Sequence, residues 1–376
     1  MWLLLGNALL VTCLWIGTTQ AAGPAGFATI DRSGWPRALT SEADFDIASR
    51  AEILMFSKVL LNTEGLDAEN LTQRLGVKSV DIKSVEQVRQ RFWQRLLDGY
   101  GKASANCHGE PFCPSVRNLA ELRESAASFT VSARDTFGTW ATSSQNFHEQ
   151  YLNEQLRLAA LFPKTSSEIQ RFDDAELNGD ELADRQFLLT FDDGPSAVGG
   201  HTETVTSVLR THDLHGTFFV LGRPFQIRLQ KTSADKLSEL YRDQCVSLHG
   251  WEHKSHSHWS EWQSSVVRSA TLLSHTLPSN YQPLFRPPYG QRLSDSAAFF
   301  KAQGIKVMLW NIDSQDWSKQ ISSSAAGQRV QTLMLLWRHG IILFHDIHNK
   351  APSAVSALIA TNKGNGVQWL DCRTQR

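Results

Sequence analysis

The residues that could do chemistry are concentrated in the second half of the chain. Asp192 and Asp193 stand side by side in the stretch TFDDGPS, and His249 and His253 lie four residues apart in HGWEH. Two imidazoles and one carboxylate suit a catalytic divalent metal that keeps a position open for water. We therefore expect Asp193, His249 and His253 to hold a metal, with Zn²⁺ as the first choice and Co²⁺, Ni²⁺ or Mn²⁺ as alternatives.

A second carboxylate beside a metal ligand has a defined use. With Asp193 on the metal, Asp192 can accept a proton from the metal-bound water, whose pKa the metal lowers to about 7. Adjacent aspartates repel one another, so a nearby cation is needed, and Arg286 can supply it. The plain alternative is that DDGP is a solvated turn after a strand. We expect the neighbouring His256 and His258 to be solvent-exposed loop residues.

The elements that must position these residues read as parallel βα units. Seven short apolar runs alternate with six helix-length amphipathic stretches, and the runs are QFLLT, GTFFVL, CVSLH, PLFRP, KVMLWNI, GIILFHD and VQWLD. This alternation predicts a parallel sheet that closes, or nearly closes, into a barrel. Reactive residues of such barrels gather at the carboxyl ends of the strands. Asp192 follows the first run, His249 ends the third, Arg286 closes the fourth, Asp316 follows the fifth and His345 closes the sixth, so we expect these residues at one mouth.

Five motifs of this half resemble those of the polysaccharide deacetylases of carbohydrate esterase family 4. In order, they are TFDDGPS, HGWEH, RPPYG, DSQDW and LFHD. That family removes acetyl groups from N-acetylated or O-acetylated sugars. The resemblance, which covers residues 186–372, implies a distorted (β/α) barrel of about seven parallel strands and a metal-dependent hydrolase.

The resemblance implies the following catalytic roles for residues in matching motif positions. Asp192 corresponds to the general base, and Asp193, His249 and His253 correspond to the metal ligands. His345 corresponds to the general acid that protonates the leaving amine or alcohol. The family therefore assigns to these residues the same chemistry that their types suggest.

Further matching positions would support this chemistry. Arg286 corresponds to the arginine that pairs with the base, and Asp316 to the carboxylate that keeps the acid histidine protonated. The backbone N–H of Tyr289 corresponds to the donor that stabilises the oxyanion of the tetrahedral intermediate. Trp317, Leu343 and Pro287 correspond to residues that line the substrate pocket of the family.

The sequence departs from the family pattern at two positions. The residue after the first metal histidine is usually Ser or Thr, and the one after the second is usually Pro. Here these positions hold Gly250 and Lys254. Loss of the hydroxyl removes a hydrogen bond that would steady the loop, so we expect either weaker metal binding or a loop that is held in another way.

The remaining sequence is divided into three parts. Residues 1–21 predict a secretory signal peptide, because they contain an apolar block, no charged side chain and small residues before Ala21. An uncleaved anchor is the alternative, although the block is shorter than the roughly 20 residues that span a bilayer. Residues 22–172 predict a mainly α-helical domain of unassigned role. Residues 173–185 form an acidic linker before the catalytic domain, residues 186–376.

Cysteine usage agrees with export to the periplasm or the extracellular space. Cys13 lies within the signal, which leaves an even number of cysteines in the mature chain. Cys107 and Cys113 flank the loop HGEPF and are the candidate disulfide. Whether Cys245 and Cys372 pair stays open, because sequence does not show whether two strands meet at those points.

These observations predict an enzyme that hydrolyses carbon–nitrogen bonds other than peptide bonds. It would remove acetyl groups, N-acetyl before O-acetyl, from a cell-envelope or extracellular polysaccharide, using metal-bound water, an Asp base and a His acid. With a formal net charge of -1 and 20% charged residues in 376, we expect no nucleic-acid partner and no stable membrane insertion after signal cleavage. The alternatives are an amidase for a small non-carbohydrate substrate and a catalytically weak glycan-binding protein.

Overall fold

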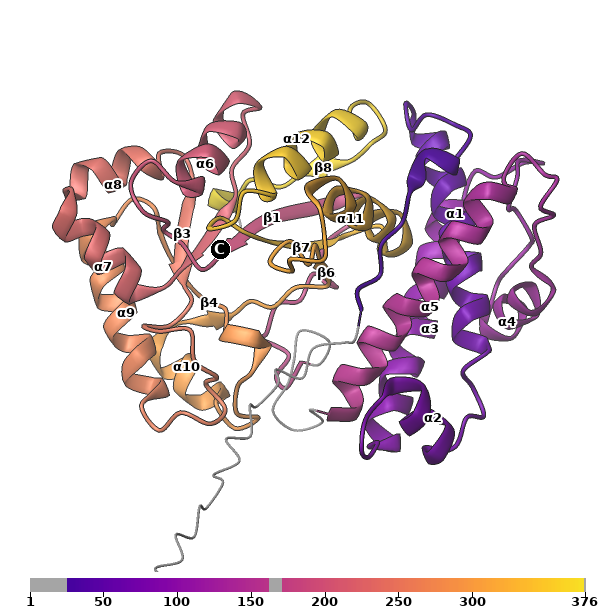
Figure 1. Ribbon diagram of the computed structural model, residues 1–376, viewed down its shortest axis with the longest axis horizontal. Helices are drawn as coiled ribbons and strands as arrows, with labels where there is room; N and C mark the ends of the chain where they lie inside the picture. Colours follow the sequence, from indigo (N-terminus) through magenta and orange to yellow (C-terminus); the bar gives the residue numbers. More distant parts are fainter. Residues whose placement is uncertain (1–25, 162–170, 375–376) are drawn as a thin grey trace, which may run out of the picture.

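The computed structural model describes residues 26–161 and 171–374, which form a helical part and a sheet-containing part (Figure 1). The expected signal peptide, residues 1–21, lies outside these ranges together with Cys13. Within the two ranges, no helix is both long enough and apolar enough to cross a membrane.

The helical part is built around α1, which packs against α3, α4 and α5. Its helices are α1 (Glu42–Leu61), α2 (Ala68–Leu75), α3 (Ile82–Ser104), α4 (Leu119–Ser128) and α5 (Gly138–Leu161). Side chains at the N-caps, Ser41, Asp67, Asp81 and Asn118, each accept a hydrogen bond from the N–H three residues further on. Such caps satisfy donors that the first helical turn leaves unpaired. The mainly helical character expected for this half is confirmed.

The second part contains a rolled parallel sheet. Its strands are β1 (Gln186–Asp192), β2 (Thr217–Val220), β3 (Cys245–Leu248), β4 (Tyr281–Phe285), β5 (Lys306–Val307), β6 (Ile312–Asp313), β7 (Gly340–His345) and β8 (Gln368–Trp369). The order along the sheet is β5-β4-β3-β2-β1-β7-β6, every neighbouring pair is parallel, and β8 pairs with the start of β1. The distorted (β/α) barrel of about seven parallel strands is thereby confirmed.

The run KVMLWNI differs from the expectation, because it forms two strands rather than one. Its start is β5 and its end is β6, which lie at opposite edges of the sheet. The four residues between them, Met308–Asn311, carry the chain from one edge to the other. The sheet therefore curls until its edges approach, without a ladder of hydrogen bonds joining β5 to β6.

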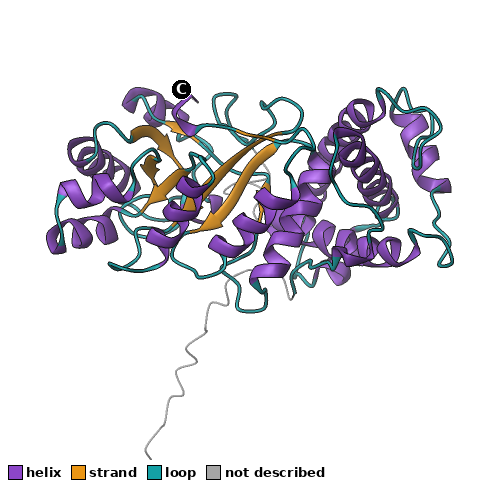
Figure 2. Ribbon diagram, turned by 90° about the horizontal axis from the view of Figure 1, so that it is seen from above, coloured by secondary structure: helices purple, strands orange, loops and turns teal. Residues whose placement is uncertain are grey.

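Within residues 171–374, seven helices accompany the strands, as parallel connections require. They are α6 (His201–Thr211), α7 (Gly222–Lys231), α8 (Ala234–Leu240), α9 (Trp262–Thr276), α10 (Ala297–Gln303), α11 (Ser323–Trp337) and α12 (Ala351–Thr361). Short 3₁₀ turns occur at Arg32–Gly34, Pro288–Gly290 and Cys372–Thr374. Seen from above, these helices surround the strands, and the bundle α1 to α5 lies at one side (Figure 2).

The two parts meet mainly through α11, which packs against α1 and α3. Arg329 of α11 is fully buried and donates to Glu154 of α5 at 2.7 Å. The backbone of Ala28 joins the same pair, because its N–H donates to Glu154 and its carbonyl accepts from Arg329. Residues 26–34, which we call the N-terminal strap, therefore run between the two parts and are fixed to both (Figure 1).

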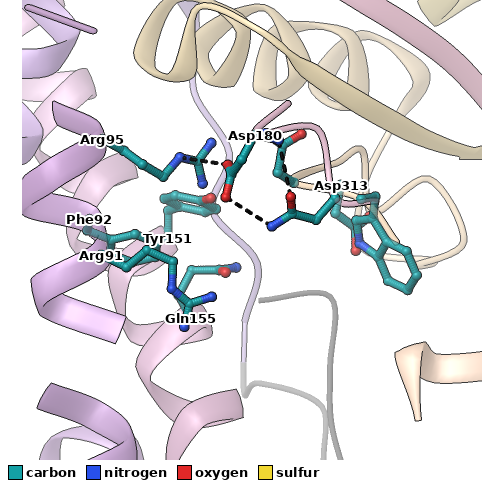
Figure 3. A pocket seen from close by; sticks show the side chains of 10 residues that line it. Arg91, Phe92, Arg95, Tyr151, Gln155, Asp180 and Asp313 are labelled. Carbon is teal, nitrogen blue, oxygen red and sulfur yellow. Dashed lines mark hydrogen bonds and ion pairs between the residues drawn. The ribbon is translucent and has the colours of Figure 1, made fainter. Parts of the chain in front are cut away.

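The segment expected to be a linker, residues 173–185, packs against both parts. Leu177 forms a bridge with Met308, and a buried ion pair joins Glu176 to Arg292. Asp180 lies 3.3 Å from Arg95 of α3. Figure 3 shows this pair in a pocket whose other labelled residues come from α3, α5 and the end of β6. Ion pairs thus hold the segment to the barrel through Arg292 and to the helical part through Arg95.

Two disulfides are present in the described residues. One joins Cys107 to Cys113 in the loop between α3 and α4, which is the expected pair. The other joins Cys245 at the start of β3 to Cys372 near the end of the chain. This second pairing, left open by the sequence, arises because β8 leads the chain back to the end of the sheet where the strands begin.

Removing Glu154 tests the junction between the two parts. Glu154→Ala leaves the Arg329 guanidinium buried without its carboxylate, so we expect the free energy of unfolding to fall by about 3–5 kcal/mol. Glu149→Ala is the matched control, because Glu149 lies on the same helix and accepts only a surface hydrogen bond from Gln145 among the bonds found. Urea unfolding followed by circular dichroism measures both, and equal losses for the two variants would contradict the assignment.

Candidate metal and acid-base site

The parallel strands bring the predicted residues to one mouth. Asp192 and His345 end β1 and β7 and are direct partners in the register of these neighbouring strands. His249 follows β3, and Arg286 follows β4. Asp316 lies in the loop after β6 and contacts His345. The structure therefore gathers the side chains that sequence placed at separate strand ends.

Three of these side chains form a group that can hold a metal ion. Oδ1 of Asp193 lies 3.3 Å from Nε2 of His249 and 3.4 Å from Nε2 of His253. Nδ1 of His249 contacts the Arg286 carbonyl at 2.8 Å, which fixes the tautomer and leaves Nε2 facing Asp193. The Asp193 Oδ1 atom is buried and has no hydrogen-bond partner. A buried carboxylate oxygen without a donor, facing two imidazole nitrogens, fits a divalent cation.

The protonation of this group also fits metal binding, since ligands must be deprotonated. Burial opposes the ionisation of Asp193, but the neighbouring His249, His345 and His253 hold the pKa of its carboxyl well below the usual range. Burial and the charge of His249 lower the pKa of His253 to about 4. At neutral pH, the carboxylate is charged and the His253 imidazole is neutral.

Asp192 is held in a second, fully buried contact. Nη1 of Arg286 donates to Asp192 Oδ1 at 2.8 Å and to Thr190 Oγ1 at 2.7 Å. Asp192 Oδ2 lies 3.8 Å from Nε2 of His249 and so faces the metal-binding group. Arg286 therefore binds Oδ1 of Asp192, and Oδ2 is left facing Asp193, His249 and His253.

His345 is held by Asp316 through two bonds. Its Nδ1 lies 2.7 Å from Asp316 Oδ1, and its backbone N–H donates to Oδ2 at 3.0 Å. Burial alone would lower the pKa of His345, but the charge and hydrogen bond of Asp316, with Asp193 and Asp192, raise it to about 10. The imidazolium therefore persists at neutral pH, and Nε2 is the nitrogen available for proton transfer.

The predicted pocket residues differ in exposure. Tyr289 has a positive φ of 60° and is 56% exposed, and its ring lies 4.4 Å from that of His253. Trp317, directly after Asp316, is 45% exposed. Two exposed aromatic side chains thus adjoin the reactive residues, while Leu343 and Pro287 are buried.

His256 is buried, so its expected exposure is wrong, whereas His258 is exposed as expected. Burial lowers the pKa of His256 to about 4, which keeps the ring neutral. Its Nδ1 lies 2.9 Å from the Lys254 carbonyl, and its Nε2 lies 3.2 Å from Ser265 Oγ. A neutral ring with the proton on Nδ1 satisfies both contacts. The apolar surroundings could not be read from a stretch as polar as HKSHSH.

This buried histidine explains the departure from the family pattern at Gly250. Gly250 has a φ of 85°, and a Cβ there would lie 2.7 Å from Cε1 of His256. Ser265 Oγ, which contacts His256, also accepts the N–H of Trp251 at 2.7 Å. The loop between His249 and His253 is therefore held by His256 and Ser265 in place of a hydroxyl at position 250.

Two residues of the mouth have structural contacts that the sequence reasoning did not assign. Thr190 shares Arg286 with Asp192, and its position two residues earlier on the same strand face could have indicated this. Asp346 is completely buried, and burial with the charges of Asp193 and Asp192 raises its pKa to about 7. Its carboxylate lies against Gly194, where any side chain would collide. Asp346 therefore explains the glycine in DDGP.

The sheet-containing part is similar to known proteins. Residues 179–308 match the family model described as polysaccharide deacetylase. A peptidoglycan-N-acetylglucosamine deacetylase of Bacillus cereus is 28% identical over 226 residues, which cover 57% of this chain and 77% of that protein. A protein of the same description from Listeria monocytogenes is 28% identical over 189 residues, covering 50% of this chain but only 38% of its own length.

A solved structure of a peptidoglycan N-acetylglucosamine deacetylase in complex with an N-hydroxybenzamide compound is 20% identical. The superposition covers 52% of this chain and 90% of that one, with a TM-score of 0.46. The family model spans β1 to β5, including the TFDDGPS, HGWEH and RPPYG motifs; DSQDW and LFHD follow it. These motifs all open onto the mouth of a single barrel, and residues 179–308 carry the polysaccharide deacetylase domain that the family model describes.

Proposed function

We propose that the protein is a metal-dependent hydrolase that removes acetyl groups from a cell-envelope or extracellular polysaccharide. The observation that carries the proposal is the buried Asp193 oxygen, which faces two histidines and has no hydrogen-bond donor. Both relatives compared above are described as peptidoglycan-N-acetylglucosamine deacetylases, which favours an N-acetyl over an O-acetyl group as the target.

Asp193, His249 and His253 would hold the metal, with Zn²⁺ as the first choice for this ligand set. When bound, a divalent cation polarises the acetyl carbonyl and lowers the pKa of water. The protein supplies the ligand orientation, since the Arg286 carbonyl fixes the ring of His249. The loop carrying His253 is braced by His256.

Asp192 would act as the general base. Arg286 occupies Oδ1 and prevents the carboxylate from turning, so Oδ2 is the oxygen that accepts a proton from the attacking water. The same arginine compensates the negative charge that two adjacent aspartates create. The backbone N–H of Tyr289 would donate to the oxyanion that forms as water adds to the carbonyl.

His345 would act as the general acid. The amine leaves the tetrahedral intermediate readily only when its nitrogen is protonated, and a histidine charged at neutral pH can deliver that proton from Nε2. Asp316 holds the opposite nitrogen and keeps the ring charged. The base and the acid thus come from the neighbouring strands β1 and β7, on which Asp192 and His345 are register partners.

The rest of the chain fits an exported enzyme with a positioning domain. We propose that residues 1–21 direct export and that residues 22–172 form a domain that supports the barrel. Residues 173–185 would connect it to the catalytic domain, which continues to residue 376. The two disulfides are in keeping with an oxidising compartment, the periplasm or the extracellular space.

Metal removal, together with two variants, distinguishes the role of the metal ligands from the role of the base. We expect a chelator to abolish acetate release from N-acetylglucosamine oligomers and added Zn²⁺ to restore it. Asp193→Ala should lose Zn²⁺ binding in calorimetry, because a ligand is gone. Asp192→Asn should keep Zn²⁺ binding but lose roughly 10²- to 10⁴-fold in kcat.

The same assay separates the alternative functions. Binding of the oligomers without acetate release would indicate a glycan-binding protein. Release of acetate from a small acetamide, but from no sugar, would indicate an amidase. Chelator-resistant release would contradict the metal role.

Replacement of Asp316 tests the source of the His345 charge. Asp316→Asn removes the carboxylate that raises the His345 pKa to about 10, so the imidazolium should lose its proton at lower pH. We expect the alkaline limb of the kcat/KM profile to move towards neutral pH. Asp235→Asn, at an exposed position, is the control and should keep the wild-type profile. If the alkaline limb of the profile stays in place in Asp316→Asn, a group other than His345 determines its pKa.

Replacement of His256 tests the brace of the metal loop. His256→Ala removes the contacts to Lys254 and Ser265, so we expect Zn²⁺ affinity to fall at least tenfold, as for other supporting residues of metal sites. His258→Ala is the matched control from the same loop, because His258 is exposed. Calorimetric titration of both variants, with thermal melting to check folding, decides the point. Equal affinities would show that the loop holds its shape without His256.

A further inference from the structure

The N-terminal strap reaches the mouth of the barrel. The ring of Phe27 meets that of Trp317 edge-on, with centroids 5.3 Å apart and planes at 87°. Trp317 directly follows Asp316, the partner of His345, and is 45% exposed. A residue from the start of the chain thus packs against a predicted wall of the substrate pocket.

The strap is bonded to both parts of the protein at residues that follow Phe27. The backbone of Ala28 is bonded through its N–H to Glu154 and through its carbonyl to Arg329. Further along, Arg32 donates to the fully buried Glu52 at 2.7 Å. Buried charges of this kind are expensive to desolvate, and their best-attested use is to specify one arrangement of the chain. The arrangement specified here is the one that sets Phe27 on Trp317.

The same network extends to the loop that carries Trp317. Nε of Arg329 donates to the Asp313 carbonyl at 2.8 Å. Asp313 ends β6 and accepts the N–H of Gln315, the residue before Asp316. One arginine therefore connects the strap backbone with the loop that holds Asp316 and Trp317. Phe27 and Trp317 are fixed relative to each other by backbone bonds as well as by ring contact.

Exposed aromatic surface is scarce elsewhere on the molecule. Across residues 26–161 and 171–374, six large hydrophobic side chains are exposed, and the aromatic ones among them are Tyr289 and Trp317. Tyr289 contacts His253, and Trp317 adjoins Asp316, so both border the reactive residues. Aromatic faces pack well against flat, partly apolar rings, and the C–H faces of sugar rings are of this kind.

We propose that the N-terminal strap is a specificity-determining part of the substrate groove. Phe27 is a positioning residue that holds the Trp317 indole so that its exposed face binds a sugar ring next to the one that is deacetylated. The inference rests on the proposed function, because it takes an N-acetylglucosamine oligomer as the occupant. It gives the helical half a role in selecting chain length, since Glu154 and Glu52 of that half fix the strap.

Binding of sugar oligomers by the full chain tests this inference. In an Asp192→Asn background, which prevents turnover, calorimetry measures the Kd of the N-acetylglucosamine tetramer and monomer in the presence of Zn²⁺. Loss of one aromatic pair is worth about 0.5–1.5 kcal/mol. Phe27→Ala should therefore raise the tetramer Kd by about two- to tenfold, and the monomer Kd by less.

Coupling between the two rings distinguishes positioning from general stability. Trp317→Ala should raise the tetramer Kd at least as much as Phe27→Ala, and the double variant should be no weaker than Trp317→Ala alone. Phe27→Tyr keeps the ring and should restore binding. Phe129→Ala is the matched control, because Phe129 is also half-buried and ring-paired, with Phe112 of the helical part.

Three results would overturn the inference. They are an unchanged tetramer Kd in Phe27→Ala, additive effects of Phe27→Ala and Trp317→Ala, and no tetramer binding by the Asp192→Asn protein. Acetate release by the wild-type protein is measured separately and bears on the proposed function alone. If the wild-type protein releases acetate but Phe27→Ala binds the tetramer as tightly as its parent, only the role of the strap is rejected. If Phe27 and Trp317 are coupled in binding but no acetate is released, only the hydrolase function is rejected.

Discussion

The buried guanidinium of Arg286 is the group on which both the barrel and its mouth depend. Two of its nitrogens donate to the carbonyls of Met308 and Leu309, where β5 has ended and β6 has not begun. A third holds Asp192, and the carbonyl of Arg286 itself fixes His249. The side chain thus satisfies backbone groups that the irregular sheet edge leaves unpaired, which buried backbone requires. Arg286 therefore both helps to close the sheet and orients the reactive residues at its mouth.

Charge balance at the mouth explains why the site suits a cation. Asp192 is paired with Arg286, and Asp316 is paired with His345. Among the described residues, no arginine or lysine pairs with Asp193. Its Oδ1 faces His249 and His253, and His253 stays neutral at ordinary pH. Burial makes an unpaired carboxylate costly. A divalent ion between Asp193 and the two histidines would remove this cost, so metal binding would stabilise the fold as well as prepare the chemistry.

Several contacts tie the helical half to the barrel. α11 belongs to the barrel but packs against α1 and α3, and Phe56 of α1 meets Trp337 of α11 edge-on at 5.6 Å. Glu154 and Glu52 complete the junction through Arg329 and the strap. Because Arg329 also donates to the carbonyl of Asp313, at the start of the loop that holds Asp316, a change in the packing of the two halves would alter the mouth of the barrel.

The sequence by itself determined the strand alternation, the position of the reactive residues at strand ends and the chemistry that their types suggest. These follow from local patterns, since burial of parallel strands produces apolar runs and the carboxyl ends of those runs share one edge. Tertiary structure alone decided the split of KVMLWNI into β5 and β6, the burial of His256, the Cys245–Cys372 pairing and the contact of Phe27 with Trp317. Each of these depends on contacts between segments that are far apart in the chain. A local sequence pattern carries no information about which distant residues will be brought into contact.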